Sequence, residues 1–292
     1  MNQWFEQWLA HWLSPWFEVG QFLGLWLLCW SPFAWTVGRY LKWEFPHPPT
    51  PVQKIPLVLS LYLLAPPLLW AWLDHRGETF QALGWCWSAS FGRHVGLGLG
   101  LALLSLLLFW GLEWAMGWIQ ISVEPARLFR QLGPILIVAM LISAVEELLF
   151  RGFVATRFLS GTGAEMAAGS VMFSLTVLSG IGLTNLLFAL LHLPWERWQA
   201  VTPQLPGLWL LGVVLSIASI RWGDLGVAVG LHGGWVWAIA TIDGMDGLKP
   251  TGKVPAWVTG LGGSLLAGAG GIMFLALMGG GMIVLPRVLL KI

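Results

Sequence analysis

The residues of this chain whose types suit catalysis are two adjacent glutamates, an arginine and two histidines, spread over three apolar stretches. Glu146, Glu147 and Arg151 lie in SAVEELLFRGF. His192 ends NLLFALLH, and His232 lies within VAVGLHGGWVW. Carboxylates and imidazoles are the side chains that most often transfer protons in catalysis. The pattern therefore predicts acid–base chemistry, provided that the three stretches meet in space.

The spacing of the two glutamates indicates different tasks for them. Glu147 precedes Arg151 by four residues, which is the favourable order for a salt bridge along a helix. Glu146 is rotated from Glu147 by about 100° on a helix. One carboxylate can therefore be neutralised by Arg151, while the other stays available for proton transfer.

A second helical face carries Asn185, Phe188 and His192, at positions i, i+3 and i+7. This spacing puts an amide and an imidazole along one inward seam. A buried histidine is often only a satisfied hydrogen-bonding group, and a Glu–Arg pair can simply fix helix register. Ionisable groups cost at least ~2.5 kcal/mol each at membrane depth. Their presence on three separate spans therefore favours a functional site.

The elements that carry these residues are expected to be membrane-spanning helices. The chain has 292 residues, of which 57% are hydrophobic and 10% charged, whereas soluble domains are about 25% charged. Apolar runs of about 20 residues match the thickness of a bilayer, and lipid favours helices over open strands. We therefore predict an all-α polytopic membrane bundle of about eight transmembrane helices, near residues 19–38, 55–73, 95–119, 133–155, 168–192, 205–221, 225–242 and 258–285.

The N-terminal residues 1–18 predict an amphipathic interfacial helix, followed by a single bundle over residues 19–292. Tryptophan recurs every four residues from Trp4 to Trp16, with polar residues on the opposite side. Such a stripe suits a helix lying in the membrane interface, and it suits packing against the bundle equally well.

The glycine-dense last span indicates close helix packing rather than a ligand site.

Composition and charge exclude several classes of protein. So apolar a chain cannot provide the polar surface of a soluble enzyme, and 15 Lys and Arg against 14 Asp and Glu leave no polycationic surface for nucleic acid.

The Glu and His set could bind zinc or iron, but no HExxH spacing is present. Arg151 would also repel a cation near Glu147, so we expect no metal and no cofactor. A proton-relay transporter would bury similar residues, but no inverted repeat is evident.

At these residues the sequence resembles the CAAX prenyl endopeptidase and bacteriocin-processing family of intramembrane proteases, the CPBP or Abi family. The first family motif has two glutamates followed, after three residues, by arginine, and it is matched by Glu146, Glu147 and Arg151. The second motif is Phe-x-x-x-His, matched by Phe188 and His192. The resemblance is specific over about residues 130–240 and concerns only the general architecture elsewhere.

The third family motif, His-x-x-x-Asn/Asp, is matched only in part. The chain keeps His232 but has Val236 at the last position. In the family the asparagine stands beside the histidine as a second donor to the oxyanion, and the loss of one such donor costs about 2.7–4 kcal/mol. Asn185, or the indole of Trp235 or Trp237, could take its place.

The resemblance implies peptide-bond hydrolysis by an activated water molecule. Carried over to this chain, Glu146 is the general base and holds the water together with His192. Arg151 orients the first motif through Glu147, and His232 stabilises the oxyanion. Support and substrate contacts are expected from Phe188, Asn185 and Trp235, in a polar cavity that opens to one membrane face.

The implied partners are the lipid bilayer and a membrane-associated protein or peptide substrate, in a setting that can include a membrane-protein complex. The family distribution implies a bacterial inner membrane or a thylakoid membrane. Because Val236 replaces the asparagine, an alternative stays open. The chain could be a non-catalytic family member that binds a membrane-protein client as an assembly or stability factor.

Overall fold

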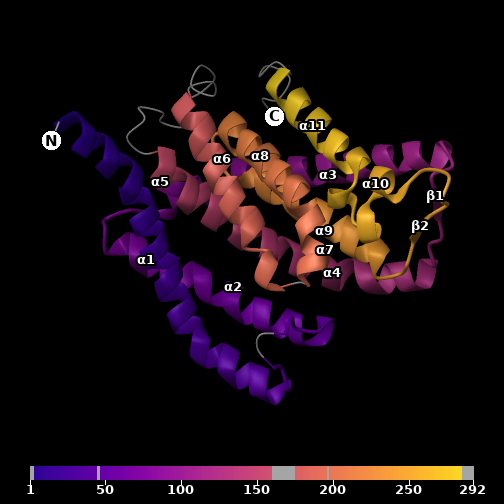
Figure 1. The fold of residues 1–292 in the computed structure, drawn as a ribbon, viewed down its shortest axis with the longest axis horizontal. Coiled ribbons are helices and arrows are strands. Elements are labelled where there is room, and N and C mark those ends of the chain that lie inside the picture. Colours follow the sequence, from indigo (N-terminus) through magenta and orange to yellow (C-terminus); the bar gives the residue numbers. More distant parts are fainter. Residues whose placement is uncertain (1–2, 45–46, 160–174, 196, 285–292) are drawn as a thin grey trace.

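The computed structural model describes residues 3–44, 47–159, 175–195 and 197–284, and the structural statements below concern these residues (Figure 1). Nearly all of their regular structure is helical. Two three-residue strands, β1 (Ile119–Ile121) and β2 (Leu248–Pro250), pair antiparallel at one end of the bundle. The predicted all-α membrane fold is confirmed.

Five helical stretches of the described chain are long and apolar enough to cross a membrane, and they coincide with expected spans. They contain α2 (Pro51–Asp74), α3 (Ala89–Ala115), α4 (Pro125–Glu147) with η2 (Leu148–Val154) and α5 (Ala155–Leu159), α6 (Leu175–Leu190), and α7 (Trp198–Val201) with α8 (Leu205–Trp222). Short 3₁₀ turns join them at η1 (Phe80–Leu83), η4 (Leu193–Trp195) and η5 (Thr202–Gln204). Residues 168–174 of one expected span lie outside the described residues.

Three further expected spans correspond to α1 (Gln3–Tyr40), α9 (Gly226–Asp243) and α11 (Ala269–Val284). Helix α1 runs without interruption across the boundary expected at residue 18. The side chains of residues 3–12 are not described, so the interfacial position of this segment stays a prediction.

The last helix begins later than the sequence led us to expect. The stretch from residue 256 to 267 forms the short turns α10 (Ala256–Thr259), η6 (Leu261–Gly263) and η7 (Leu265–Ala267). Gly260, Gly262 and Gly263 have φ values of 137°, 64° and 84°, which a right-handed helix does not contain. These glycines therefore end the helical path before α11.

Helix α9 lies between α3 and α4 and is the central element of the bundle. One of its faces carries Gly226, Gly230 and Gly234, and a Cβ atom at Gly230 would lie 2.1 Å from the carbonyl oxygen of Val95 on α3. Small residues permit such a close approach of two backbones. The backbone contact fixes the depth and rotation of α9, and with them the position of His232.

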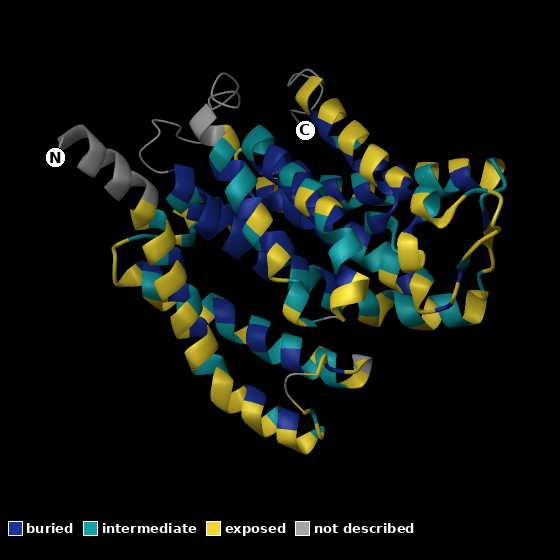
Figure 2. Cartoon of the chain, viewed as in Figure 1, coloured by how far each residue is buried: buried dark blue, intermediate teal, exposed yellow. Residues whose placement is uncertain are grey.

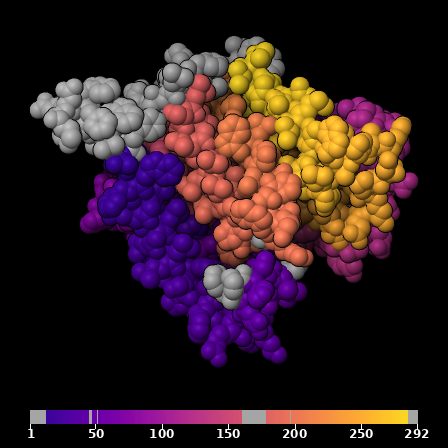
Figure 3. Space-filling view, viewed as in Figure 1, coloured from indigo at the N-terminus to yellow at the C-terminus, as the bar shows by residue number. Residues whose placement is uncertain are grey.

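Helices α1 and α2 form a pair along one side of the molecule (Figures 1 and 3). The Trp26 indole donates a hydrogen bond of 2.9 Å to the carbonyl of Leu61, and Glu18 pairs with Arg157 of α5 at 2.7 Å. The outward faces of both helices are exposed, as expected of surfaces that meet lipid, whereas the bundle interior is buried (Figure 2). This arrangement brings the middle of α2 against α4.

Candidate active site

The candidate site begins where the winding of one transmembrane stretch changes. Helix α4 ends at Glu147 and continues as a π-helix, η2, all of whose residues are buried. Wider π turns are rare and frequently occur at functional sites. The sequence predicted only ordinary helix here, because a hydrophobic pattern does not distinguish a short π segment from an α-helix.

Glu147 is neutralised deep inside the bundle. Arg151 donates a hydrogen bond of 2.9 Å from Nη1 to Glu147 Oε1, and these side chains are 1% and 0% exposed. His232 Nδ1 lies 2.8 Å from the same oxygen. A carboxylate accepts hydrogen bonds, so this Nδ1 carries the proton. The pairing of Glu147 with Arg151 expected from their spacing is thus present.

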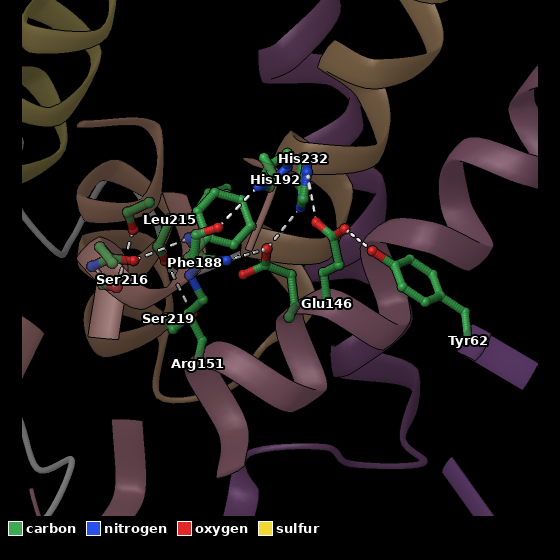
Figure 4. Close-up of polar contacts among 12 residues, drawn as sticks. Tyr62, Glu146, Arg151, Phe188, His192, Leu215, Ser216, Ser219 and His232 are labelled. Carbon is green, nitrogen blue, oxygen red and sulfur yellow. Dashed lines mark hydrogen bonds and ion pairs between the residues drawn. The ribbon is translucent and has the colours of Figure 1, made fainter. Parts of the chain in front are cut away.

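Glu146 is held differently, with one protein group at each oxygen. The hydroxyl of Tyr62 on α2 donates a hydrogen bond to Oε1, and His232 Nε2 lies 3.6 Å from Oε2 (Figure 4). The second distance is longer than a direct hydrogen bond. The imidazole of His232 therefore lies between the two carboxylates, bonded to Glu147 and facing Glu146.

Phe188 links the second motif to the first. Its ring is fully buried, with Arg151 Cζ 4.5 Å from the ring centroid. The rings of His192 and His232 meet it edge to face, at centroid distances of 4.9 and 6.1 Å. Phe188 thus contacts the guanidinium of Arg151 and the imidazoles of both histidines.

His192 follows the end of α6 and is oriented by the same residue. Its Nδ1 lies 2.9 Å from the Phe188 carbonyl oxygen. A carbonyl can only accept, so Nδ1 donates, and in the neutral ring Nε2 is an acceptor. The Phe-x-x-x-His spacing therefore sets the tautomer of His192 as well as its position.

A cavity of about 270 Å³ joins these groups. Its lining includes Glu146 and His192 together with Tyr62, Lys54 and Gln204. A water molecule occupies about 30 Å³ in the liquid, so the cavity has room for water and for part of a substrate. The structure thus brings Glu146 and His192 to one cavity, with His232, Glu147 and Arg151 buried behind Glu146.

Asn185 lies apart from this cavity and is fully engaged. Its amide nitrogen donates both hydrogens, to the carbonyl of Ile181 at 2.8 Å and to Ser216 Oγ at 3.0 Å. Its oxygen accepts from Arg151 Nη2 at 3.2 Å. Asn185 therefore orients Arg151, and it has no free N–H for an oxyanion.

The two indoles considered as substitute donors are engaged as well. Trp235 Nε1 donates to Ser105 Oγ at 3.1 Å, and Trp237 Nε1 donates to the Leu132 carbonyl at 2.8 Å. Trp235 is not among the residues that line the cavity, and its ring packs on Phe274. The tryptophans follow His232 in sequence, but helix rotation turns them toward neighbouring helices.

Tyr62 is a site residue to which the sequence did not point. It is one of only two tyrosines in the chain and lies in a largely apolar helix. A hydroxyl at membrane depth needs a hydrogen-bond partner, and this requirement is the one feature of the sequence that could have marked Tyr62 as a site residue. Its partner could not be named from sequence, because 84 residues separate it from Glu146.

Comparison with known families addresses the same region. Residues 128–238 match the family described as type II CAAX prenyl endopeptidase, Rce1-like. The family resemblance is confirmed. The matched segment contains the first two motifs and His232 of the third, and it agrees with the range of about 130–240 inferred from them. No curated protein and no solved structure matches the chain. Its apolar helices and its likeness to this family of membrane endopeptidases mark an integral membrane protein.

Proposed function

We propose that this protein is an intramembrane endopeptidase in which Glu146 activates water to hydrolyse peptide bonds of membrane-associated proteins. The observation that carries the proposal is the unequal treatment of the two adjacent glutamates. Glu147 is neutralised by Arg151, whereas Glu146 lines a cavity that also contains His192. A general base must lie within reach of the water that it deprotonates, and Glu146 meets that requirement.

The proposed reaction uses a water molecule bound between Glu146 and the Nε2 atom of His192. Glu146 takes one proton, and the resulting hydroxide attacks the carbonyl carbon of the substrate. The carbonyl oxygen becomes an oxyanion, and Glu146 then passes its proton to the departing amine. No bond to the enzyme forms at any stage.

The oxyanion needs donors, and we assign them to His232 and Tyr62. The hydrogen bond of 2.8 Å between His232 Nδ1 and Glu147 orients the ring so that its Nε2 edge faces the side of Glu146, where the oxyanion forms. Tyr62 lines the cavity beside Glu146 and donates its hydroxyl hydrogen to that carboxylate in the resting site. We propose that this hydroxyl turns to the oxyanion once Glu146 has taken up a proton, and so replaces the donor that Val236 lacks. Phe188 positions both imidazoles, while Asn185 acts only through Arg151.

One observation favours a second candidate function. Val236 has no donor, and the N–H groups of Asn185, Trp235 and Trp237 are all bound elsewhere. A chain with the fold but without turnover would act as an assembly or stability factor that binds a membrane-protein client. In that case the cavity would bind a segment of the client without cleaving it.

The experiment compares wild type with Glu146→Gln in proteoliposomes. The probes are a farnesylated CAAX peptide and a quenched-fluorescent transmembrane peptide. Glutamine keeps the shape but takes no proton, so we expect cleavage to fall by about 10²–10⁴-fold. Glu124→Gln, which alters an exposed carboxylate at the start of the same helix, should leave the rate unchanged.

Two outcomes would count against the hydrolytic proposal. Equal cleavage by wild type and Glu146→Gln would remove the proposed base. Absence of cleavage, with the same membrane protein accumulating in cells that carry either form, would favour the binding function. Membrane fractionation would test the location that we propose from the family, a bacterial inner membrane or a thylakoid membrane.

A further inference from the structure

A second cavity, of about 420 Å³, lies where the ends of α3 and α9 meet the β1–β2 ribbon. Polar groups on its walls include Glu113 near the end of α3 and Asp243 at the end of α9. Trp110, Ile239 and Leu265 are among its apolar lining residues. None of these residues takes part in the proposed hydrolysis.

Glu113 is a buried carboxylate without a partner. The residue is only 4% exposed, and its Oε1 atom is inaccessible and accepts no hydrogen bond. Asp243 is exposed and lies at the rim of the cavity. Within the described part of the chain, no basic side chain pairs with either carboxylate. Burial of an unpaired carboxylate is costly, and a cation bound beside Glu113 would offset that cost.

Two basic side chains at this end of the bundle bind helix ends. Lys253 Nζ donates to the Met116 carbonyl at 2.7 Å, and Arg127 Nη2 donates to the Gly244 carbonyl at 2.7 Å. The carbonyl ends of α3 and α9 carry partial negative charge, which these contacts offset. These two side chains therefore do not pair with Glu113, and a ligand from outside can do so.

The shape and chemistry of the cavity favour an organic cation over a metal ion. Among the described residues, no group of three His, Cys, Asp or Glu side chains is placed to hold a metal. The cavity is much larger than a single ion, and its walls are partly apolar. Trp110 adds a ring on which an ammonium or guanidinium group can rest. An ammonium or guanidinium group on an apolar stem matches both features.

One residue connects this cavity with the catalytic one. Gln204 lines both cavities, and its Oε1 accepts a hydrogen bond of 2.9 Å from Ser264 Oγ. Its Nε2 donates to the Ala200 carbonyl at 2.8 Å. The two cavities are therefore neighbours, divided by the Gln204 side chain.

We propose that the Glu113 cavity binds the ammonium or guanidinium end of a basic side chain in the polypeptide that occupies the Glu146 cavity. The identity of the ligand as a substrate rests on the proposed function, whereas the binding of an organic cation does not. Glu113 pairs with the cation at the inner end, and Asp243 attracts it at the rim.

Cation binding is tested with n-hexylamine and its neutral counterpart n-hexanol, titrated against the whole protein in nanodiscs. We expect wild type to bind the protonated amine at least about tenfold more tightly, because a hydrogen bond to a charged group is worth that factor or more. Glu113→Gln should abolish the preference, and Glu124→Gln should retain it. Equal binding of amine and alcohol, or an unchanged preference in Glu113→Gln, would overturn the proposal.

Asp243→Asn provides a second variant at an exposed position, where folding is not at stake. It should weaken amine binding by a smaller factor than Glu113→Gln does. A preference for the amine that survives both substitutions would show that these carboxylates do not form the site. Far-UV circular dichroism of each variant checks that the helices are intact.

A further experiment decides whether the cation comes from a polypeptide or from a lipid headgroup. It uses the Glu146→Gln variant, so that binding is measured without cleavage. A transmembrane peptide with a juxtamembrane lysine should displace hexylamine, and its norleucine counterpart should not. The same measurement is made in nanodiscs of phosphatidylglycerol and in nanodiscs that contain phosphatidylethanolamine. If phosphatidylethanolamine displaces hexylamine and the peptide does not, the site binds a lipid headgroup, and the substrate part of the proposal is refuted. If wild type binds the amine but cleaves neither peptide probe, the result counts against the proposed hydrolysis and not against the cation site.

Discussion

Replacing Arg151 by methionine isolates the contribution of the buried ion pair. Methionine keeps the apolar stem and removes the guanidinium, which donates to Glu147 at 2.9 Å and to Asn185 at 3.2 Å. Glu147 is 0% exposed in its side chain. The substitution therefore leaves a carboxylate buried with only the imidazole of His232 as a partner.

The magnitude follows from what the guanidinium does at this depth. Removing one partner of a buried pair costs about 3–5 kcal/mol, mainly because the remaining charge is uncompensated. The contact with the Phe188 ring is lost as well, and such contacts are worth up to about 2 kcal/mol when desolvated. We expect Arg151→Met to lower the free energy of unfolding by about 4 kcal/mol.

The double variant Glu147→Gln with Arg151→Met separates these effects. The double variant has no unpaired buried charge, but it still lacks the contact with the Phe188 ring. It should therefore recover about 2 kcal/mol of the free energy of unfolding that Arg151→Met loses. Unfolding is followed by far-UV circular dichroism in mixed micelles of rising dodecyl sulfate content. Arg93→Met, at an exposed position on α3, should change stability by less than about 0.5 kcal/mol. A double variant as unstable as Arg151→Met would refute the reasoning, because the buried charge would then not be the cause.

Three further substitutions test other parts of the site. Tyr62→Phe removes the hydroxyl at Glu146 and should lower the cleavage rate by about 10²-fold with little change in substrate affinity; an unchanged rate would remove Tyr62 as an oxyanion donor. Because Tyr62 is proposed to supply the donor that Val236 lacks, Val236→Asn should change the cleavage rate little, and a rise of about 10²–10³-fold would show that a missing donor limits the rate. Gly230→Ala places a Cβ 2.1 Å from the Val95 carbonyl oxygen and should destabilise the bundle by more than about 2 kcal/mol, measured by thermal unfolding. Gly100→Ala meets nothing within 4 Å and serves as its control, so equal effects would contradict the packing argument.

The local features of the site could be predicted from the sequence because helix geometry determines them. The four-residue spacing of Glu147 and Arg151 sets their pairing, and the spacing of Phe188 and His192 sets the hydrogen bond that orients the imidazole. Apolar runs of bilayer length determined the membrane class and the helical fold. The order of the motifs predicted the family resemblance and the range of residues that it covers.

Contacts between helices were decided only by the tertiary structure. Glycines let α9 approach α3 at backbone distance, and this contact sets the rotation that turns His232 toward the glutamates and Trp235 toward Ser105. The hydroxyl of Tyr62 reaches Glu146 because α2 packs on α4, and Gln204 divides two cavities because η5 lies between them. Spacing along one helix is a property of its backbone, whereas the depth and rotation of one helix against another depend on the packing of many side chains at once.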